Sequence, residues 1–184
     1  SKELGVDVFL GAARFVADGV VEVDGARLAY RKAVIATGAR AAEPDVPGLR
    51  DAGFLTNETV FSLTERPRRL AVLGGGPIGC ELAQAFQRLG SEVTLFHDRA
   101  HVLDREDADA AEIVQRALVR DGVRLVLGAK LGRVERRGAE KRILYTGEGG
   151  GSEVVVDEIL VGAGRQPNVE GLGLEPVGVS FDVR

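Results

Sequence analysis

Apolar and polar positions follow two periods along this chain, and the change of period marks the expected elements. Residues 70–73 form a short apolar run typical of a buried strand. Apolar side chains then recur at the spacing of one helical face, at Ile78, Leu82, Ala85, Phe86 and Leu89. Gly90 ends this helix, and residues 93–96 form a second, largely apolar strand. The succession predicts a strand, a helix and a second strand parallel to the first.

The turn between the first strand and the helix has the glycine pattern G-x-G-x-x-G at Gly74, Gly76 and Gly79. In this pattern the first glycine allows a tight turn, the second lets a pyrophosphate approach the backbone, and the third lets the helix pack on the strand. The helix N-terminus offers free N–H groups and a partial positive charge to that pyrophosphate. An acid about 20 residues further on, here Asp98, would hold a ribose hydroxyl. The stretch predicts dinucleotide binding; the alternative is a glycine turn with a structural role alone.

Residues 1–38 are predicted to be rich in strands. Short apolar or alternating runs occur at residues 6–10, 13–16, 20–23, 27–30 and 32–37. The dipeptides Asp18-Gly19 and Asp24-Gly25 flank the third run, and both are typical of hairpin turns. Pro44, Pro47 and Gly48 then mark an irregular connection, after which residues 57–63 could form a short helix.

The chain after Asp98 alternates between helix and strand patterns. A helix is expected at residues 106–120, and strands at 123–127, 131–136, 142–146, 153–156 and 158–161. The apolar side of this helix is expected at Ile113, Val114, Ala117 and Leu118. The whole order predicts an α/β fold, with a Rossmann-like parallel sheet, helices on both of its faces and an antiparallel β-meander.

Composition and charge narrow the function. The chain has 184 residues, 45% of them hydrophobic, and a net charge of −4, with no basic stripe that would bind nucleic acid. No apolar run approaches the length of a membrane span, and no signal peptide opens the chain. Its one cysteine excludes an internal disulfide, which is consistent with a cytoplasmic location. Because the chain starts at Ser1 and has no methionine, we expect it to be part of a longer protein.

Four stretches resemble the FAD-dependent pyridine nucleotide-disulfide oxidoreductases, which include dihydrolipoamide dehydrogenase, mercuric reductase and glutathione reductase. They are AVIATGAR at 33–40, GGGPIGCELA at 74–83, VDEILVGAGRQPN at 156–168 and GLGLEPVGV at 171–179. The resemblance implies an NAD(P) domain inserted into an FAD domain. Residues 1–50 would then be the later part of an incomplete FAD-binding domain and 51–66 a linker. Residues 67–165 would be the NAD(P)-binding domain, and 166–184 the return toward the FAD domain.

The resemblance also implies the cofactor-binding positions. The pyrophosphate would lie against Gly74, Gly75, Gly76, Pro77, Ile78 and Gly79, and the nicotinamide end near Glu81. His97 and Asp98 would face the ribose, backbone at Gly162 and Gly164 would approach the dinucleotide, and Thr37 and Gly38 would reach FAD. Glu81 could instead be an acid that only complements the helix dipole. Cys80 has no second cysteine to pair with, and we interpret it as a small buried packing residue.

Acids near the expected ribose position favour NADH over NADPH. Asp98 and Asp104 would repel a 2′-phosphate of about −1.5 to −2 charge, whereas only Arg99 and Arg105 could attract it. The family's C-x-x-x-x-C redox pair is absent here, so we expect no catalytic residue in this stretch and no activity from it alone. No spacing of His, Cys and acids indicates a metal site.

The resulting hypothesis is the NAD(H)-binding portion of a flavoprotein oxidoreductase. In the parent, hydride would pass from NADH to FAD, and electrons would go on to a disulfide or a metal ion. The resemblance implies that the parent is a homodimer. Two alternatives remain open at this point: a stand-alone dinucleotide-binding module that senses the redox state, and a flavin-dependent NADH oxidase or reductase without a redox cysteine pair.

Overall fold

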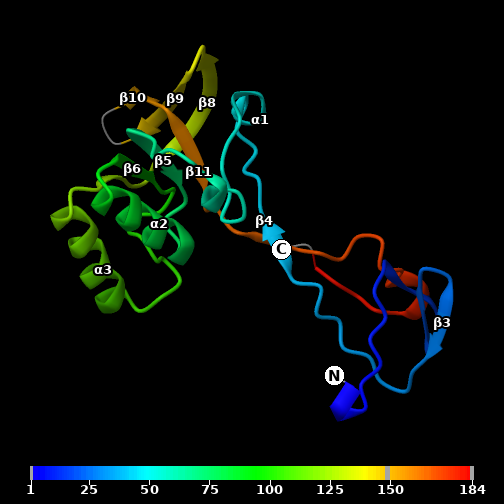
Figure 1. Cartoon of the computed structure of the whole chain (residues 1–184). Coiled ribbons are helices and arrows are strands. Elements are labelled where there is room, and N and C mark those ends of the chain that lie inside the picture. Colours follow the sequence, from blue (N-terminus) through cyan, green and yellow to red (C-terminus); the bar gives the residue numbers. More distant parts are fainter. Residues whose placement is uncertain (1, 148–149, 183–184) are drawn as a thin grey trace. The chain divides into compact units, whose positions relative to one another are not determined.

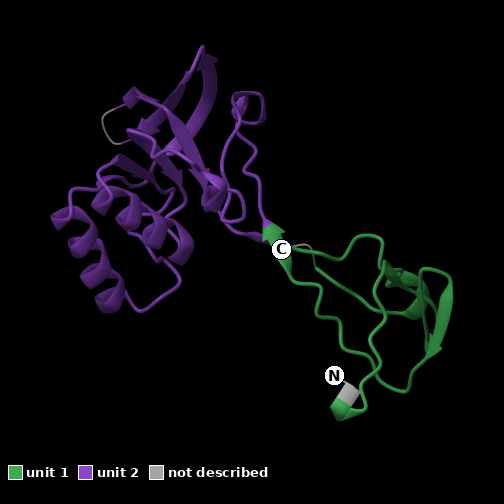
Figure 2. Ribbon diagram, viewed as in Figure 1, with its two compact units in different colours: residues 1–40, 166–184 green, residues 41–165 purple. Residues whose placement is uncertain are grey.

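The computed structural model describes residues 2–147 and 150–182, which form two compact units (Figure 2). Unit 1 joins residues 1–40 with residues 166–184, and unit 2 consists of residues 41–165. Unit 2 contains the glycine-rich turn and the strands and helices predicted around it.

Unit 2 is built on a parallel four-stranded sheet with the order β11-β5-β6-β7 (Figure 1). The strands are β5 (Arg69–Leu73), β6 (Glu92–Phe96), β7 (Arg124–Val126) and β11 (Glu158–Val161). Leu73 pairs with Phe96 on one side and with Val161 on the other, so these three strands end level with one another. The loops that follow the strands therefore start from one edge of the sheet.

Both faces of this sheet are buried, by alternate side chains of the same strands. Leu70 and Val72 belong to a core that includes residues of α2 (Pro77–Arg88) and α3 (Ala108–Arg120), the two helices seen side by side in Figure 1. Ala71 and Leu73 point the other way, into a second core. A strand buried on both faces reads as a continuous apolar run, which explains the pattern at residues 70–73.

The second face is covered by an antiparallel meander of three strands, β8 (Lys130–Arg137), β9 (Glu140–Gly147) and β10 (Gly150–Val156). The single-turn helix α1 (Leu49–Ala52) packs into the same core, and Phe96 meets Tyr145 edge to face at 5.0 Å between ring centroids. The predicted α/β fold with a parallel sheet and an antiparallel meander is confirmed. Helical cover on this face is limited to α1, because the meander occupies most of it.

The buried faces of the two long helices differ from the expected ones. In α2 the most buried side is made of the small residues Gly79, Cys80 and Ala83, while Leu89 is 67% exposed. Small residues let the helix axis come close to the sheet, so larger apolar residues flank the contact instead. In α3 Ala111 and Leu118 are buried, whereas Ile113 is 67% exposed because it lies off the side that they define.

Residues 51–66, expected to be a linker, pack into unit 2. Leu55 donates its N–H to the carbonyl oxygen of Ile159 at 2.7 Å and accepts from the N–H of Val161 at 2.8 Å. Val60 is 3% exposed in the core below α2 and α3. The helix predicted for residues 57–63 is the short 3-10 helix η2 (Val60–Ser62). The compact unit thus begins at residue 41 and includes this connection.

Unit 1 contains a three-stranded antiparallel sheet of β1 (Ala13–Ala17), β2 (Val20–Val23) and β3 (Ala26–Ala29). Asp24 and Gly25 both have positive φ, of 45° and 88°, as the predicted tight hairpin between β2 and β3 requires. Phe15 of β1 donates its N–H to the carbonyl oxygen of Leu172 at 2.7 Å, which ties the sheet to the C-terminal segment. That segment includes η3 (Glu175–Val177), and η1 (Lys2–Leu4) lies near the N-terminus of the chain.

Two runs predicted as strands, residues 6–10 and 32–37, are not strands in unit 1. Their apolar side chains are exposed, with Leu10 at 88% and Val34 at 92%. A strand needs a neighbour for its N–H and C=O groups, and neither run pairs into a sheet within the described residues. The chain beyond the second run continues into β4 (Ala39–Ala41), which forms a two-stranded sheet with β12 (Arg165–Pro167).

Candidate functional site

A cavity of about 1000 Å³ lies in unit 2 at the edge where the parallel strands end. It is lined by residues 73–78, 96–99, 103–106, 128–131 and 162–165, together with Pro44 and Val46. Most of these segments directly follow β5, β6, β7 and β11. In open α/β sheets the carboxyl ends of the strands are the usual place for ligands, and the volume suits a small molecule or cofactor.

The three glycines of the turn have different surroundings, and each excludes a side chain for its own reason. A Cβ atom at Gly74, whose φ is +113°, would lie 2.6 Å from the carbonyl oxygen of Gly162. A Cβ at Gly79 would lie 1.9 Å from the carbonyl oxygen of Gly74. At Gly76 a Cβ would meet nothing within 4 Å. Two glycines are therefore required by packing, and Gly76 stands beside open space at the cavity.

Gly76 is also the N-cap of α2, and Pro77 is its first residue. Gly76 accepts the N–H of Cys80 at 3.0 Å, and no side chain caps this helix end. The first N–H groups of a helix have no partner within the helix, and Pro77 has none to offer. Ile78 lines the cavity, so its N–H group remains for a ligand, at a helix end that favours negative charge.

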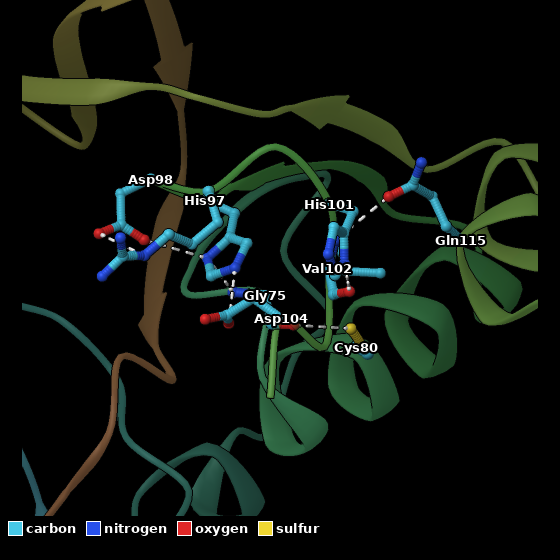
Figure 3. Close-up of polar contacts among 9 residues, drawn as sticks. Gly75, Cys80, His97, Asp98, His101, Val102, Asp104 and Gln115 are labelled. Atoms are coloured by element: carbon cyan, nitrogen blue, oxygen red, sulfur yellow. Dashed lines mark hydrogen bonds and ion pairs between the residues drawn. The ribbon is translucent and has the colours of Figure 1, made fainter. Parts of the chain in front are cut away.

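The peptide group of Gly75 is held on both of its sides (Figure 3). Its N–H donates to Nδ1 of His97 at 3.2 Å. Its carbonyl oxygen accepts from the N–H of Leu103 at 2.8 Å and from Sγ of Cys80 at 3.4 Å. The other ring nitrogen of His97, Nε2, lies 3.1 Å from Oδ1 of Asp104. This network joins the end of β6, the loop after it and the first turns of α2 around one glycine.

Asp98 follows His97 but has a different environment. The His97 side chain is 9% exposed, whereas that of Asp98 is 70% exposed, and both line the cavity. Arg99 lies next to Asp98, with 3.8 Å between Nε and Oδ2. Asp98 thus presents a solvated carboxylate at the cavity, and His97 presents a ring whose two nitrogens already have partners.

Cys80 is buried beside this network, as its pattern predicted, with 5% of its surface exposed. Burial raises the pKa of the Cys80 thiol to about 11, and the negative charge of Glu81 adds to the effect. A thiol that stays protonated is a weak nucleophile, which agrees with a packing role.

The cavity brings together most of the residues that the sequence singled out: Gly74, Gly75, Gly76, Pro77, Ile78, His97, Asp98, Gly162 and Gly164. Gly79 lies behind them and packs against the backbone of Gly74. Glu81 is exposed on α2, and the lining of the cavity does not include it. It also lies beyond the first turn, which has no acidic residue.

Thr37 and Gly38 belong to unit 1 and are tied to Asn168. Oγ1 of Thr37 donates to the carbonyl oxygen of Asn168 at 2.7 Å, and Nδ2 of Asn168 donates to the carbonyl oxygen of Thr37 at 3.0 Å. The N–H of Asn168 donates to the carbonyl oxygen of Gly38 at 3.0 Å. Arg40 adds a bond to Oδ1 of Asn168 at 3.0 Å and pairs with both carboxylate oxygens of Glu170.

Several residues that line the cavity lie outside the glycine pattern: Pro44, Val46, Leu103, Gly128, Ala129, Lys130, Leu131 and Ala163. For Gly128 a signal was present, since it directly follows a predicted strand of the parallel sheet and must lie at the same edge. Leu103 carried no signal, because its place depends on the path of an irregular loop.

Comparison with known proteins decides the family. The sequence profile of the pyridine nucleotide-disulphide oxidoreductases matches residues 1–184. The chain belongs to this family. It is 41% identical over 177 residues to a mercuric reductase of Lysinibacillus sphaericus, covering 96% of the chain and 32% of that reductase. It is 38% identical to a dihydrolipoyl dehydrogenase of Thermus scotoductus, covering 97% of the chain and 39% of that enzyme.

Solved structures of the family agree. The HOCl-induced flavoprotein disulfide reductase RclA of Escherichia coli matches with a TM-score of 0.83 and 31% identity, over 96% of this chain and 40% of the reductase. The chain thus spans between 32% and 40% of the length of these relatives. The predicted family and fold class are confirmed, and the chain corresponds to a portion of a flavoprotein disulfide oxidoreductase.

Two further properties concern residues 2–147 and 150–182. None of their helices has the length and apolar character needed to cross a membrane. They also bring together no group of three or more His, Cys, Asp or Glu side chains that could hold a metal ion.

Proposed function

We propose that the cavity of unit 2 binds a nicotinamide dinucleotide, with its pyrophosphate at the N-terminus of α2. The observation that carries this proposal is the contrast among the glycines of the turn. Gly74 and Gly79 are required by packing within the protein, but Gly76 faces open space beside the cavity. A glycine that the fold itself does not need is explained when a ligand approaches the backbone there.

The residues present fit such a ligand. The N–H group of Ile78 would donate to the pyrophosphate, and Gly162 and Gly164 would let the rest of the dinucleotide pass close to the backbone after β11. Asp98 would accept from ribose hydroxyls. When bound, the nicotinamide supplies a hydride, and the share of this chain is to bind and orient it.

NADH is the proposed form rather than NADPH. Asp98 and Asp104 both line the cavity at the end of β6, where the adenine ribose would lie. Oδ1 of Asp104 lies 3.1 Å from Nε2 of His97. Two acids in this place oppose a 2′-phosphate, although Arg99 and Arg105 also line the cavity and reduce the difference.

The parent protein is proposed to be an FAD-dependent homodimer in the cytoplasm that passes the hydride from NADH to FAD and on to a disulfide or a metal ion. Unit 1 would supply part of the FAD-binding domain through Thr37 and Gly38. The hydroxyl of Thr37 and the carbonyl oxygens of both residues are already bonded to Asn168, so their backbone N–H groups are what remains for FAD. No catalytic activity is expected from the 184-residue chain alone.

Binding titrations of the 184-residue chain test this proposal. The change in NADH fluorescence should saturate at one equivalent of NADH. NADPH, which carries the 2′-phosphate, should bind more weakly than NADH. A lack of saturation at millimolar NADH would remove the proposed site. Saturation with a lower dissociation constant for NADPH than for NADH would keep the site and overturn the preference.

A further inference from the structure

His97 uses its two ring nitrogens in opposite ways. Nδ1 accepts from the N–H of Gly75 at 3.2 Å and lies farther, at 3.5 Å, from Oδ1 of Asp98, so the bond from Gly75 assigns a lone pair to Nδ1. In the neutral ring the proton then resides on Nε2, which donates to Oδ1 of Asp104. The ring is 9% exposed, and these two bonds fix both its tautomer and its orientation.

The ring of His97 also leaves no room for a side chain at position 75. A Cβ atom at position 75 would lie 2.8 Å from Cγ of His97 and 2.9 Å from Cδ2. The imidazole therefore occupies the position where a side chain of residue 75 would otherwise stand. The x of the first G-x-G is a glycine here because the histidine occupies its space.

We infer that His97 is a positioning residue for the dinucleotide site and not a ligand of the dinucleotide. Its two nitrogens are committed to Gly75 and Asp104, so neither is available to a ribose hydroxyl. Through Gly75 it sets the direction of the next peptide, that of Gly76, and hence the open position at the start of α2. This inference rests on the proposed function, and it leaves the ribose contact to Asp98.

The network gives His97 this role because the backbone of Gly75 links three elements. His97 holds it from the end of β6, Leu103 from the following loop, and Cys80 from α2. Asp104 holds the far side of the ring from the same loop as Leu103. Loss of the Nδ1 acceptor would leave a buried N–H without a partner and free the peptide between Gly74 and Gly75 to rotate.

Two amide substitutions test the roles of the two ring nitrogens of His97 one at a time. In His97→Asn the side-chain oxygen can take the place of Nδ1 and accept from Gly75, whereas the contact with Asp104 is lost. In His97→Gln the longer side chain can donate to Asp104 in place of Nε2, whereas the N–H of Gly75 loses its acceptor. His97→Ala removes both contacts, and His101→Gln changes a histidine of the same loop that does not line the cavity.

Titration of each variant chain with NADH gives the decisive comparison. We expect His97→Asn and His101→Gln to bind within about twofold of the original chain, and His97→Gln and His97→Ala to bind about three- to tenfold more weakly. Equal losses in the Asn and Gln variants, or a greater loss in the Asn variant, would overturn the inference. The amide region of the NMR spectrum of each variant checks that it is folded. If His97→Ala unfolds, the comparison between His97→Asn and His97→Gln still tests the inference.

A nitrogen-15 spectrum of the original chain without NADH provides an independent measurement. It should show His97 with an unprotonated Nδ1 and a protonated Nε2, and a protonated Nδ1 would contradict the inference. If the original chain does not bind NADH, the proposed function fails. If it binds NADH but the His97 series is flat, the proposed function stands and only the positioning role fails.

Discussion

A Cβ atom at Gly79 would lie 1.9 Å from the carbonyl oxygen of Gly74, which is backbone and cannot turn aside. The first turn of α2 is thus pressed against the end of β5 with no room for a methyl group. Three residues earlier, a Cβ atom at Gly76 would meet nothing within 4 Å. Packing thus requires Gly79 to be a glycine, whereas Gly76 is explained by the proposed approach of a ligand to the backbone.

This difference predicts opposite outcomes for two alanine substitutions. Gly79→Ala should lower the free energy of unfolding of unit 2 by about 1–3 kcal/mol, because backbone must shift to admit the methyl group. Gly76→Ala should cost less than about 1 kcal/mol but weaken NADH binding, because the methyl group enters the space proposed for the pyrophosphate. Urea unfolding and NADH titration of both variants measure the two effects. Loss of stability in Gly76→Ala alone would contradict this assignment.

Removal of the charge of Asp98 should shift the preference between the two dinucleotides. In Asp98→Asn the repulsion of a 2′-phosphate falls, so the dissociation constant for NADPH should drop about three- to tenfold relative to that for NADH. Asp109→Asn removes an exposed acid of α3 that does not line the cavity, and it should leave the ratio unchanged. An unchanged ratio in the Asp98 variant would show that another group discriminates at this position.

The pKa of Glu170 offers a test of unit 1. Hydrogen bonds from the Arg40 guanidinium lower it from 4.5 to about 2, with backbone N–H groups contributing. A depressed carboxyl pKa stabilises the folded state above the unfolded value, and this contribution is lost as the pH falls from about 4.5 through about 2. Carbon-13 NMR titration should place the Glu170 midpoint near 2 in the original chain. In Arg40→Gln the midpoint should rise toward 4.5, and an unmoved midpoint would exclude Arg40 as the main cause.

The Cys80 thiol should resist alkylation in the folded chain. Because its pKa is raised to about 11, little thiolate exists at pH 8, and burial limits access as well. Iodoacetamide should label the folded chain far more slowly than the chain unfolded in urea, as followed by mass spectrometry. The raised pKa also means that this thiol favours the folded state below about pH 9 and ceases to do so as the pH rises through about 11. Rapid labelling at pH 8 would indicate that the first turns of α2 open readily.

The ion pair between Lys141 and Glu158 should respond asymmetrically to substitution. Nζ of Lys141 donates to Oε2 of Glu158 at 2.6 Å and to the carbonyl oxygen of Gly53 at 2.9 Å, and its side chain is 7% exposed against 31% for Glu158. Glu158→Gln leaves a buried ammonium without its counter-charge and should cost about 3–5 kcal/mol of stability. Lys141→Met leaves a carboxylate that water reaches, so it should cost about 1–2 kcal/mol. Equal losses of unfolding free energy in the two variants, measured with urea, would mean that water reaches the ammonium group of Lys141.

The elements that depend on a local sequence pattern could be predicted from the sequence alone. The apolar run of β5, the glycine turn and the start of α2 lie within about a dozen residues, so propensity and spacing determine them together. Tight turns such as Asp24-Gly25 were predictable for the same reason, since the required positive φ selects these residue types. The parallel direction of the strands in the sheet then followed from the alternation of strands and helices.

Features that depend on distant parts of the chain could not be predicted. The contact between Gly75 and His97 joins residues on two strand ends, and it also requires Leu103 with its positive φ of 54°, which a leucine rarely adopts. The exposure of Ile113 follows from which side of α3 meets the sheet, and an apolar periodicity that includes both sides cannot decide that. The role of Glu81 stays a prediction, because resemblance gives a position along the chain but not the direction of its side chain.

The exposed run at residues 32–37 has a practical consequence for work with the chain by itself. It combines alanine, valine, isoleucine and threonine with a single charge at Lys32, and it lacks proline and glycine. Such hexapeptides form intermolecular β-sheets when they are left accessible, and here Val34 is 92% and Ile35 40% exposed. Concentrated solutions should therefore self-associate through this segment, and a charged residue in place of Val34 should keep the chain monodisperse.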